Sequence, residues 1–340
     1  MRALKNSLVP LSILMLLVPS SSAGAIVIRH DIDPGIYGAQ GDHYPSVLTF
    51  LWPAEAGVDE TASLSATLLS QHWALTAAHG AEEFAQDTLR IEVAGVIYED
   101  VVFDRWVPHP CFDSDESPHD LGLVHFPSPP WPALDAYPRL YDQRDELGKV
   151  IVFVGRGAPG TGVLGSDGDS PGGPFRNATN TIDFVSEALL GFTFNAPTDE
   201  GISPLEGISG DGDSGGPAFM CGELSLDPLG RIACSEGLRL LGVSSFQETL
   251  EESNQIGIYG VTERYVRISS HREWITQAMT TGAAGECTER MRELGPLENS
   301  QTPSVAAGCQ GAPRLPYEAL LLWLLVPLIR ARRTVKARSY

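Results

Sequence analysis

One octet in the second half of the chain organises the rest of the sequence: Gly210-Asp211-Gly212-Asp213-Ser214-Gly215-Gly216-Pro217. It places Ser214 in a turn that carries very little side chain. A nucleophilic serine needs an exposed hydroxyl, a base within reach and backbone N–H groups directed at the oxygen that becomes charged in the transition state. Glycine permits that close approach of the backbone. The same residue types also form ordinary turns, so the octet alone does not separate catalysis from a plain loop.

Two further motifs lie upstream, and they give the turn a catalytic context. One is Leu75-Thr76-Ala77-Ala78-His79-Gly80 and the other is His119-Asp120-Leu121-Gly122-Leu123-Val124. The order along the chain is therefore histidine, aspartate, serine. These three contexts, in this order and with these separations, resemble the chymotrypsin-like (trypsin family) serine proteases. The resemblance runs from about Ile26 to about Met279, because Glu273-Trp274-Ile275 is similar to the closing helix of that family.

The resemblance implies an all-β fold of two six-stranded antiparallel β-barrels followed by a C-terminal helix. The 35 glycines and 25 prolines among 340 residues suit a turn-rich β protein. We expect residues 26–279 to form the protease domain, with the two barrels divided near residues 128–149. Residues 44–51 and 66–74 are rich in apolar and β-branched residues, which predicts two strands of the first barrel.

The resemblance also implies a reaction. His79 would act as general base, Asp120 would orient its imidazole, and Ser214 would attack a peptide carbonyl to form an acyl-enzyme. The backbone N–H groups of Gly212 and Ser214 would form the oxyanion hole. We therefore expect a serine endopeptidase that acts on protein or peptide substrates. The alternative is a catalytically silent relative that uses the fold as an extracellular binding module.

A near copy of the nucleophile motif complicates the choice of serine. Gly168-Asp169-Ser170-Pro171-Gly172-Gly173-Pro174 places Ser170 50 positions after Asp120, whereas Ser214 follows Asp120 by 94 positions. The longer separation is the one the family shows, and Pro171 interrupts the glycine pair that should follow the serine. We therefore predict Ser214 as the nucleophile and Ser170 as a loop residue.

The resemblance assigns five positions to the primary specificity pocket. Ile208, six residues before the nucleophile, takes the place of the pocket floor. Ser245, Phe246 and Gln247 match one wall, and Gly260 matches the opposite wall. An apolar floor cannot pair the charge of a buried lysine or arginine, whose desolvation is then costly. We expect cleavage after small or medium apolar residues.

The N-terminus has the three parts of a secretory signal peptide. Two basic residues precede an apolar run over residues 8–18, and an Ala-x-Ala pattern ends at Ala25. This predicts a signal peptide over residues 1–25 and an exported protein, extracellular or at the cell surface.

Removal of that peptide would create an N-terminus at Ile26. In the family such a terminus pairs with the aspartate that precedes the nucleophile, which is Asp213 in this sequence. The Gly-Gly that usually follows is replaced by Ile28-Arg29, and Ile36 is a rival terminus, so the assignment stays open.

Five cysteines in an exported chain allow two disulfides and leave one cysteine over. We predict that Cys221 pairs with Cys234 across a hairpin and that Cys111 pairs with Cys287. Cys309 stands apart near the C-terminus.

The sequence departs from the family at three cysteine positions. Leu64 and Gly80 stand where half-cystines usually bracket the histidine loop, and Gly210 stands where one precedes the nucleophile. Rigidity around the site must therefore come from packing.

The C-terminal part divides into a linker and an apolar segment. Residues 280–314 have a linker-like composition, and residues 315–340 contain the short apolar run Ala319–Ile329 and a basic tail. Together with Cys309, this resembles the tripartite sorting signals of bacterial surface proteins, especially the kind that myxosortase-type enzymes process. The alternative is a short apolar helix that anchors the chain in a membrane, although eleven residues are few for a span.

The net charge of −20 limits the partners of the folded domain. Such a field repels nucleic acid and anionic lipid, so we expect no nucleic acid and membrane contact only through the C-terminal segment. We also expect a monomer that needs no cofactor. Four histidines near the motifs lack the spacing of metal ligands, and we expect no metal: His72, His109, His119 and His125.

Overall fold

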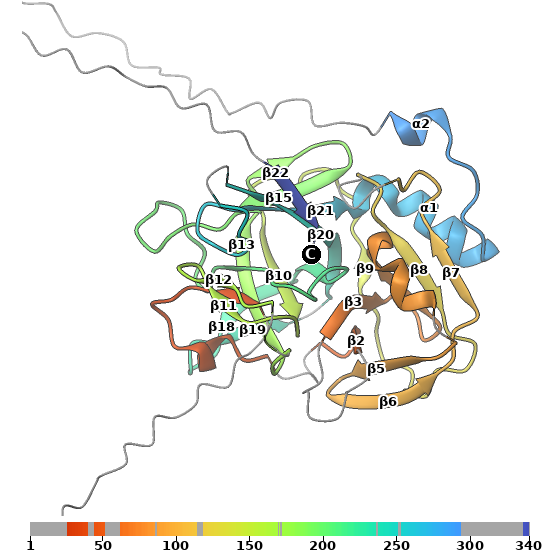
Figure 1. Ribbon diagram of the computed structural model, residues 1–340, viewed down its shortest axis with the longest axis horizontal. Helices are drawn as coiled ribbons and strands as arrows, with labels where there is room; N and C mark the ends of the chain where they lie inside the picture. Colours follow the sequence, from red (N-terminus) through yellow and green to blue (C-terminus); the bar gives the residue numbers. More distant parts are fainter. Residues whose placement is uncertain are drawn as a thin grey trace, which may run out of the picture.

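The computed structural model describes residues 26–39, 44–51, 62–85, 87–113, 118–168, 170, 172–235, 237–250, 253–293 and 336–339. Two curled sheets make up most of this part, and one main helix packs beside them (Figure 1). The expected all-β class with its closing helix is therefore confirmed. The expected signal peptide, Cys309 and Ala319–Ile329 lie outside the described residues. Within the described ranges, no helix is both long enough and apolar enough to cross a membrane.

The first sheet holds seven antiparallel strands in the order β6-β5-β2-β3-β4-β8-β7, drawn in orange to yellow in Figure 1. Its strands are β2 (Val47–Leu51), β3 (Ala62–Leu68), β4 (Trp73–Thr76), β5 (Leu89–Val93), β6 (Val96–Val101), β7 (Arg105–Pro108) and β8 (Gly122–His125).

The segment 66–74 is not one strand, as the sequence predicted, but the end of β3, a turn and the start of β4. The hydroxyl of Ser70 accepts hydrogen bonds from the N–H groups of His72 and Trp73, at 3.3 and 3.1 Å, and so closes the turn. Serine competes with the strand ladder in this way because its side chain can bond the nearby backbone.

The second sheet is built around the path β13-β10-β17-β20-β21-β15-β14, and β9 and β22 pair with β20. Its strands are β9 (Arg139–Leu140), β10 (Val150–Gly155), β13 (Arg176–Thr181), β14 (Phe184–Val185), β15 (Leu189–Thr193), β17 (Pro217–Met220), β20 (Arg239–Thr249), β21 (Thr262–Arg267) and β22 (Lys336–Ser339). The sheets therefore contain seven and nine strands rather than six each.

Two smaller sheets and two 3₁₀ helices complete the β part. A four-stranded sheet contains β1 (Val27–Ile28), β11 (Gly160–Thr161), β12 (Gly165–Ser166) and β16 (Gly207–Ile208). A hairpin is formed by β18 (Glu223–Leu226) and β19 (Ile232–Ser235). The 3₁₀ helices are η1 (Pro34–Tyr37) and η3 (Ala78–Ala85).

The main helix is α1 (Ile268–Thr281), and it packs because its apolar residues recur every three or four positions. Its buried residues are Ile268, His271, Trp274, Ile275 and Ala278. The helix ends where Gly282 takes a left-handed conformation with φ 69°. A short helix, α2 (Glu289–Arg292), follows within the segment expected to be a linker. The start of that segment is therefore folded onto the domain.

Two disulfides and one apolar contact fix the loops around the candidate site. Cys111 is bonded to Cys287 and Cys221 to Cys234, with Cα–Cα distances of 5.0 and 5.4 Å. A Cβ atom added at Gly80 would lie only 2.4 Å from the side chain of Leu64. Close packing of these two residues thus takes the place of the half-cystine pair that the family resemblance would put there.

Candidate active site

His79 and Asp120 meet at the edge of the first sheet because their strands are paired. Strands β4 and β8 place Thr76 opposite Gly122, so the segments that leave these strands lie side by side. The Oδ1 atom of Asp120 accepts a hydrogen bond from the backbone N–H of His79 at 2.8 Å, and its Oδ2 atom lies 2.7 Å from Nδ1 of His79. A carboxylate only accepts, so Nδ1 carries the proton and Nε2 has the lone pair of a base.

A residue of the second sheet also holds the aspartate. The hydroxyl of Ser245, on β20, donates to Oδ2 of Asp120 at 2.5 Å. Asp120 is fully buried, and its carboxylate is thus fixed by donors from both sheets. Ser245, which the sequence analysis placed in the pocket wall, therefore also contacts the candidate triad.

The turn with Ser214 is pressed against the segment that leads to His79. The backbone carbonyl of Ser214 accepts a hydrogen bond from the N–H of Ser65 at 2.7 Å. At Gly215, which has a φ of 76°, an added Cβ would lie 2.2 Å from the hydroxyl oxygen of Thr76 and 2.9 Å from the nitrogen of Ala77. Only glycine fits this approach, which explains why the nucleophile motif needs it.

Gly212, the other expected oxyanion residue, lies in the same turn with a φ of 83°. Its carbonyl accepts a hydrogen bond from the hydroxyl of Ser65 at 3.4 Å. Ser65 therefore holds the turn on both sides of Asp213.

The loop with Ser170 packs against this turn from outside. The hydroxyl of Ser166 donates to the carboxylate of Asp211 at 2.7 Å and accepts from its N–H at 3.1 Å. The N–H of Ser170 bonds the carbonyl of Asp167 at 2.9 Å, as in an ordinary turn. Ser166 of β12, just before the near copy of the motif, thus supports the Ser214 turn.

Asp213 is buried beneath the turn, beside Ile26. Its carboxylate accepts hydrogen bonds from the N–H groups of Gly157 and Gly210, at 2.7 and 2.9 Å, and another from the backbone of Ile26. Burial nevertheless raises the pKa of Asp213 to about 7. Ile26 is itself buried, with a φ of 62°, at the start of β1, which runs between β11 and β16.

The positions expected to form the pocket are only partly brought together. Ile208 is fully buried and pairs with Val27 of β1. Gln247, also fully buried, donates from Nε2 to the carbonyl of Ser209 at 2.7 Å and accepts from the N–H of Gly257 at 2.9 Å. Its amide therefore bridges two segments.

Phe246 and Gly260 differ in their surroundings. Phe246 is buried on β20, beside Gln247. Gly260 is exposed in the turn before β21, with a φ of 90°. Gly260, which the sequence analysis placed in the opposite wall of the pocket, thus lies where the chain turns before β21 begins.

Glu263 is the strand partner of Gln247, and the sequence analysis did not identify it. These two residues face each other in the register of β20 and β21. The fully buried carboxylate of Glu263 accepts from the N–H of Ser209 at 2.9 Å and from the hydroxyl of Ser244 at 2.8 Å. An acidic residue in the strand that follows Gly260 was the available signal.

A second group of histidines is assembled behind the triad. His109, His119 and His271 are buried, and one potential ligand atom from each lies within 4.8 Å of the others. Burial lowers the pKa of all three, to about 2 for His109 and about 4 for His271. The sequence argument against a metal considered only local spacing, and His271 lies 152 positions after His119.

Comparisons with known proteins were made for the whole sequence. A family model described as Trypsin matches residues 51–275. One solved structure that is similar to the chain is that of neuropsin, a serine protease expressed in the limbic system of mouse brain. Its TM-score is 0.48 at 15% sequence identity, and the match covers 72% of this chain and 97% of that one. No curated protein matches the sequence.

Proposed function

The chain belongs to the trypsin family and is a serine-type endopeptidase, and we propose that His79, Asp120 and Ser214 are its catalytic triad. The observation that carries this proposal is the pair of hydrogen bonds between His79 and Asp120. The Ser214 turn is held against the segment just before His79.

In this mechanism the hydrogen-bond partners of each group determine its catalytic role. Nε2 of His79 removes the proton of the Ser214 hydroxyl as the oxygen attacks the substrate carbonyl, and then delivers it to the leaving amine. The carboxylate of Asp120 keeps the proton on Nδ1 and stabilises the imidazolium that forms. The N–H groups of Gly212 and Ser214 stabilise the oxyanion, and such a donor contributes roughly 3 kcal/mol in a comparable protease.

The substrate would bind as an added strand on β20. The evidence for an accepting edge is β22, which pairs antiparallel with Phe246–Thr249 of β20. Ser245, the next residue of β20, bonds Asp120, so a peptide on this edge passes beside the candidate triad. Main-chain hydrogen bonds of this kind give affinity, and side-chain pockets give specificity.

Exchange of the nucleophile tests the triad. We expect Ser214→Ala to lower kcat/KM for peptide hydrolysis by at least about 10³-fold. Its thermal unfolding temperature should stay close to that of the wild type. Ser170→Ala is the matched control and should keep full activity. A dead Ser170→Ala variant with an active Ser214→Ala variant would reverse the choice of nucleophile. Equal activity of all three proteins, at the level of the uncatalysed reaction, would favour the silent binding module.

For specificity we propose cleavage after small apolar residues. The Gln247 amide spans from Ser209 to Gly257 and would leave little depth between them. Ile208 is buried against β1 behind this bridge. The Glu263 carboxylate already accepts hydrogen bonds from Ser209 and Ser244, so it is poorly placed to pair a basic side chain. A charge that enters without a partner is costly to desolvate.

A peptide library with a varied residue before the cleaved bond tests this specificity. Alanine or valine should be preferred there in the wild type, and Gln247→Gly should shift the preference toward leucine or phenylalanine by about tenfold in kcat/KM. Preferential cleavage after arginine or lysine by the wild type, lost in Glu263→Gln, would show that the buried carboxylate reads the substrate instead.

We also propose that the protein is exported and that cleavage after Ala25 makes Ile26 the mature N-terminus. Two disulfides support an oxidising compartment. The backbone of Ile26 already bonds the Asp213 carboxylate, so a new ammonium group would arise beside a buried acid. That ion pair would hold the turn of Ser214 in place.

A further inference from the structure

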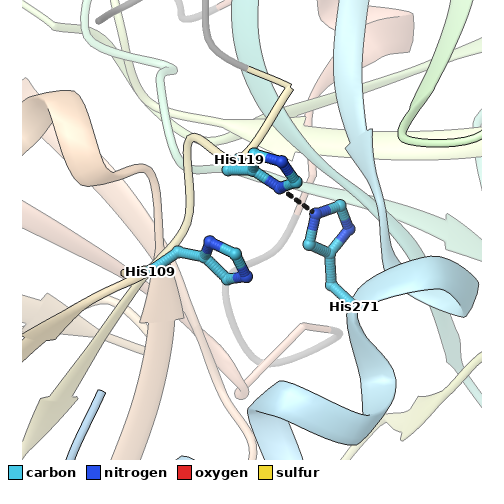
Figure 2. Close-up of side chains that lie close together, drawn as sticks. All are labelled: His109, His119 and His271. Atoms are coloured by element: carbon cyan, nitrogen blue, oxygen red, sulfur yellow. Dashed lines mark hydrogen bonds between the residues drawn. The ribbon is translucent and has the colours of Figure 1, made fainter. Parts of the chain in front are cut away.

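The three buried histidines come from three separate segments of the chain, as Figure 2 shows. His109 follows β7, His119 precedes Asp120, and His271 lies in the first turn of α1. They are 2%, 4% and 1% exposed. Nδ1 of His119 lies 3.0 Å from Nε2 of His271, and the His109 ring stacks on the His119 ring with 4.7 Å between centroids.

In His119 and His271, one ring nitrogen already has a backbone partner. That partner determines whether the other nitrogen, which faces the cluster, carries a proton or a lone pair. Nδ1 of His271 lies 2.8 Å from the carbonyl oxygen of Arg267 and must donate to it. His119 likewise bonds the backbone of Met291, in a contact that favours the protonated ring. In neutral rings the facing nitrogens, Nδ1 of His119 and Nε2 of His271, therefore both carry lone pairs. Two lone pairs at 3.0 Å repel each other unless a proton or a metal cation lies between them.

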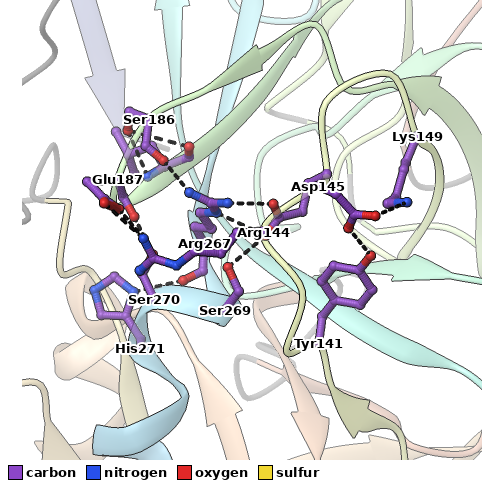
Figure 3. Close-up of polar contacts among 12 residues, drawn as sticks. Tyr141, Arg144, Asp145, Lys149, Ser186, Glu187, Arg267, Ser269, Ser270 and His271 are labelled. Carbon is purple, nitrogen blue, oxygen red and sulfur yellow. Dashed lines mark hydrogen bonds and ion pairs between the residues drawn. The ribbon is translucent and has the colours of Figure 1, made fainter.

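The scaffold around the cluster is built to hold it. The guanidinium of Arg267, one residue before α1, bonds both carboxylate oxygens of the buried Glu146 at 2.9 and 2.6 Å. Figure 3 shows that Ser269 and Ser270, which precede His271, take part in the same network of polar contacts. The disulfide between Cys111 and Cys287 ties the loop after His109 to the segment that carries Met291.

We propose that His109, His119 and His271 bind a zinc ion that regulates the peptidase. Zinc is commonly held by three histidine nitrogens at about 2.0–2.1 Å, with a fourth position open to water. A metal-ligating histidine usually donates its other N–H to a carbonyl or carboxylate, which is the arrangement of His119 and His271. His109 differs, because its Nδ1 accepts from the N–H of Cys111 at 3.2 Å. In the neutral ring this nitrogen has the lone pair and would be the ligand atom, so zinc would replace that hydrogen bond. Imidazole ligands suit zinc, copper and nickel, whereas calcium and magnesium prefer oxygen ligands.

A cavity gives the ion and its water a route to the cluster. It has a volume of about 470 Å³ and is bounded by His109 and His271 on one side and by Thr288 and Met291 on another. Its charged lining residues are Arg144, Arg290 and Glu273. The site is therefore buried from bulk solvent but reachable through the space between α1 and α2.

Occupation of the site would act on catalysis through the neighbour of His119. Nitrogens bound to one tetrahedral zinc ion lie about 3.4 Å apart, so the 3.0 Å separation between His119 and His271 must widen when zinc binds. Asp120 follows His119 directly and holds His79 through contacts of 2.7 and 2.8 Å. A shift of about 1 Å in a positioning group can lower a rate by about 10²-fold. Zinc is therefore an inhibitor that lowers kcat, and this regulatory role rests on the triad proposed above.

Calorimetric titration of the untagged, metal-free Ser214→Ala protein with zinc chloride tests binding without any reference to activity. We expect one zinc ion per chain, no response to calcium chloride, and a rise in unfolding temperature with zinc. His271→Gln should weaken zinc binding by at least about 100-fold. The control is His125→Gln, because His125 lies outside the cluster and bonds Asp104. Absence of binding below millimolar zinc, or binding that His271→Gln leaves intact, would overturn the site.

Kinetics of the active chain test the regulation separately. Each variant is compared with its own metal-free rate, so a partly damaged His271→Gln enzyme remains informative. Saturating zinc should lower kcat of the wild type and of His125→Gln by about tenfold or more and leave kcat of His271→Gln unchanged. Zinc that binds with full stoichiometry and does not change kcat would refute the coupling. Equal inhibition of all three enzymes would place the inhibitory ion elsewhere, for example on His79.

Discussion

His119 and Asp120 are neighbours in the chain, yet they belong to two different groups of histidines. On one side, the Asp120 carboxylate holds His79 in the tautomer that a general base needs. On the other side, His119 meets His109 and His271, where burial lowers the pKa of each ring. We therefore propose two roles for the same residue type: a base beside a carboxylate, and a neutral metal ligand where no carboxylate is bonded to it. The environment of a histidine, more than its position near a motif, determines its chemistry.

The two groups also differ in how the chain encodes them. The triad positions lie in short motifs whose glycines and small residues are needed locally, as the contact between Gly215 and Thr76 illustrates. The cluster joins a loop, the residue before Asp120, and a helix far along the chain. No local sequence pattern predicts this histidine cluster, because its members meet only when α1 packs on the first sheet.

Substitution of Asp120 and of His119, one at a time, should give the largest difference in kcat. Asp120→Asn keeps the shape of the side chain but favours the wrong tautomer of His79, and we expect kcat to fall by about 10⁴-fold. His119→Asn should lower the metal-free kcat by about tenfold at most and should also remove the response to zinc. Steady-state hydrolysis of a peptide reporter, with and without a chelator, measures both effects.

The comparison between the neighbours fails if the two variants behave alike. An equally inactive His119→Asn enzyme with a normal unfolding temperature would mean that His119 takes part in the reaction itself. Asp120→Asn activity within tenfold of the wild type would remove Asp120 from the triad.

Asp213 is expected to have a smaller effect, on the pH dependence of stability. The effect arises before cleavage after Ala25 gives its buried carboxyl group an ammonium partner. While Ala25 is still attached, Ile26 offers only an amide N–H, and the pKa of Asp213 is raised from 3.8 to about 7. The folded chain then holds a proton that the unfolded chain releases. The resulting stability is complete below about pH 4 and is lost as the pH rises toward 7, by up to about 4 kcal/mol.

Urea unfolding between pH 4 and 7.5 measures this loss in a Ser214→Ala background. The chain that retains Ala25 should lose stability as the pH rises, and Asp213→Asn in that chain should remove the slope. The chain that begins at Ile26 should keep its stability over this range, because an ammonium group lowers the pKa of Asp213. Identical slopes for the two wild-type N-termini would refute the proposed ion pair.

The sequence predicted the fold, and the proposed triad residues lie in short motifs, because those features depend on local chemistry. It did not identify Glu263, which stands opposite Gln247 in the register of β20 and β21. It also foresaw that packing would replace the missing half-cystines, but not that Leu64 would fill the space at Gly80. Strand register and helix docking decide such contacts, and both depend on the whole fold.

Labelling with a fluorophosphonate probe, followed by peptide mapping, tests the central claim most directly. The probe reacts only with a serine that a base activates, so it reports the triad without any assumption about substrate. We predict a single adduct, on Ser214, that is lost in Asp120→Asn. An adduct on Ser170, or no adduct on the folded, disulfide-bonded protein, would contradict the assignment of Ser214 as the nucleophile.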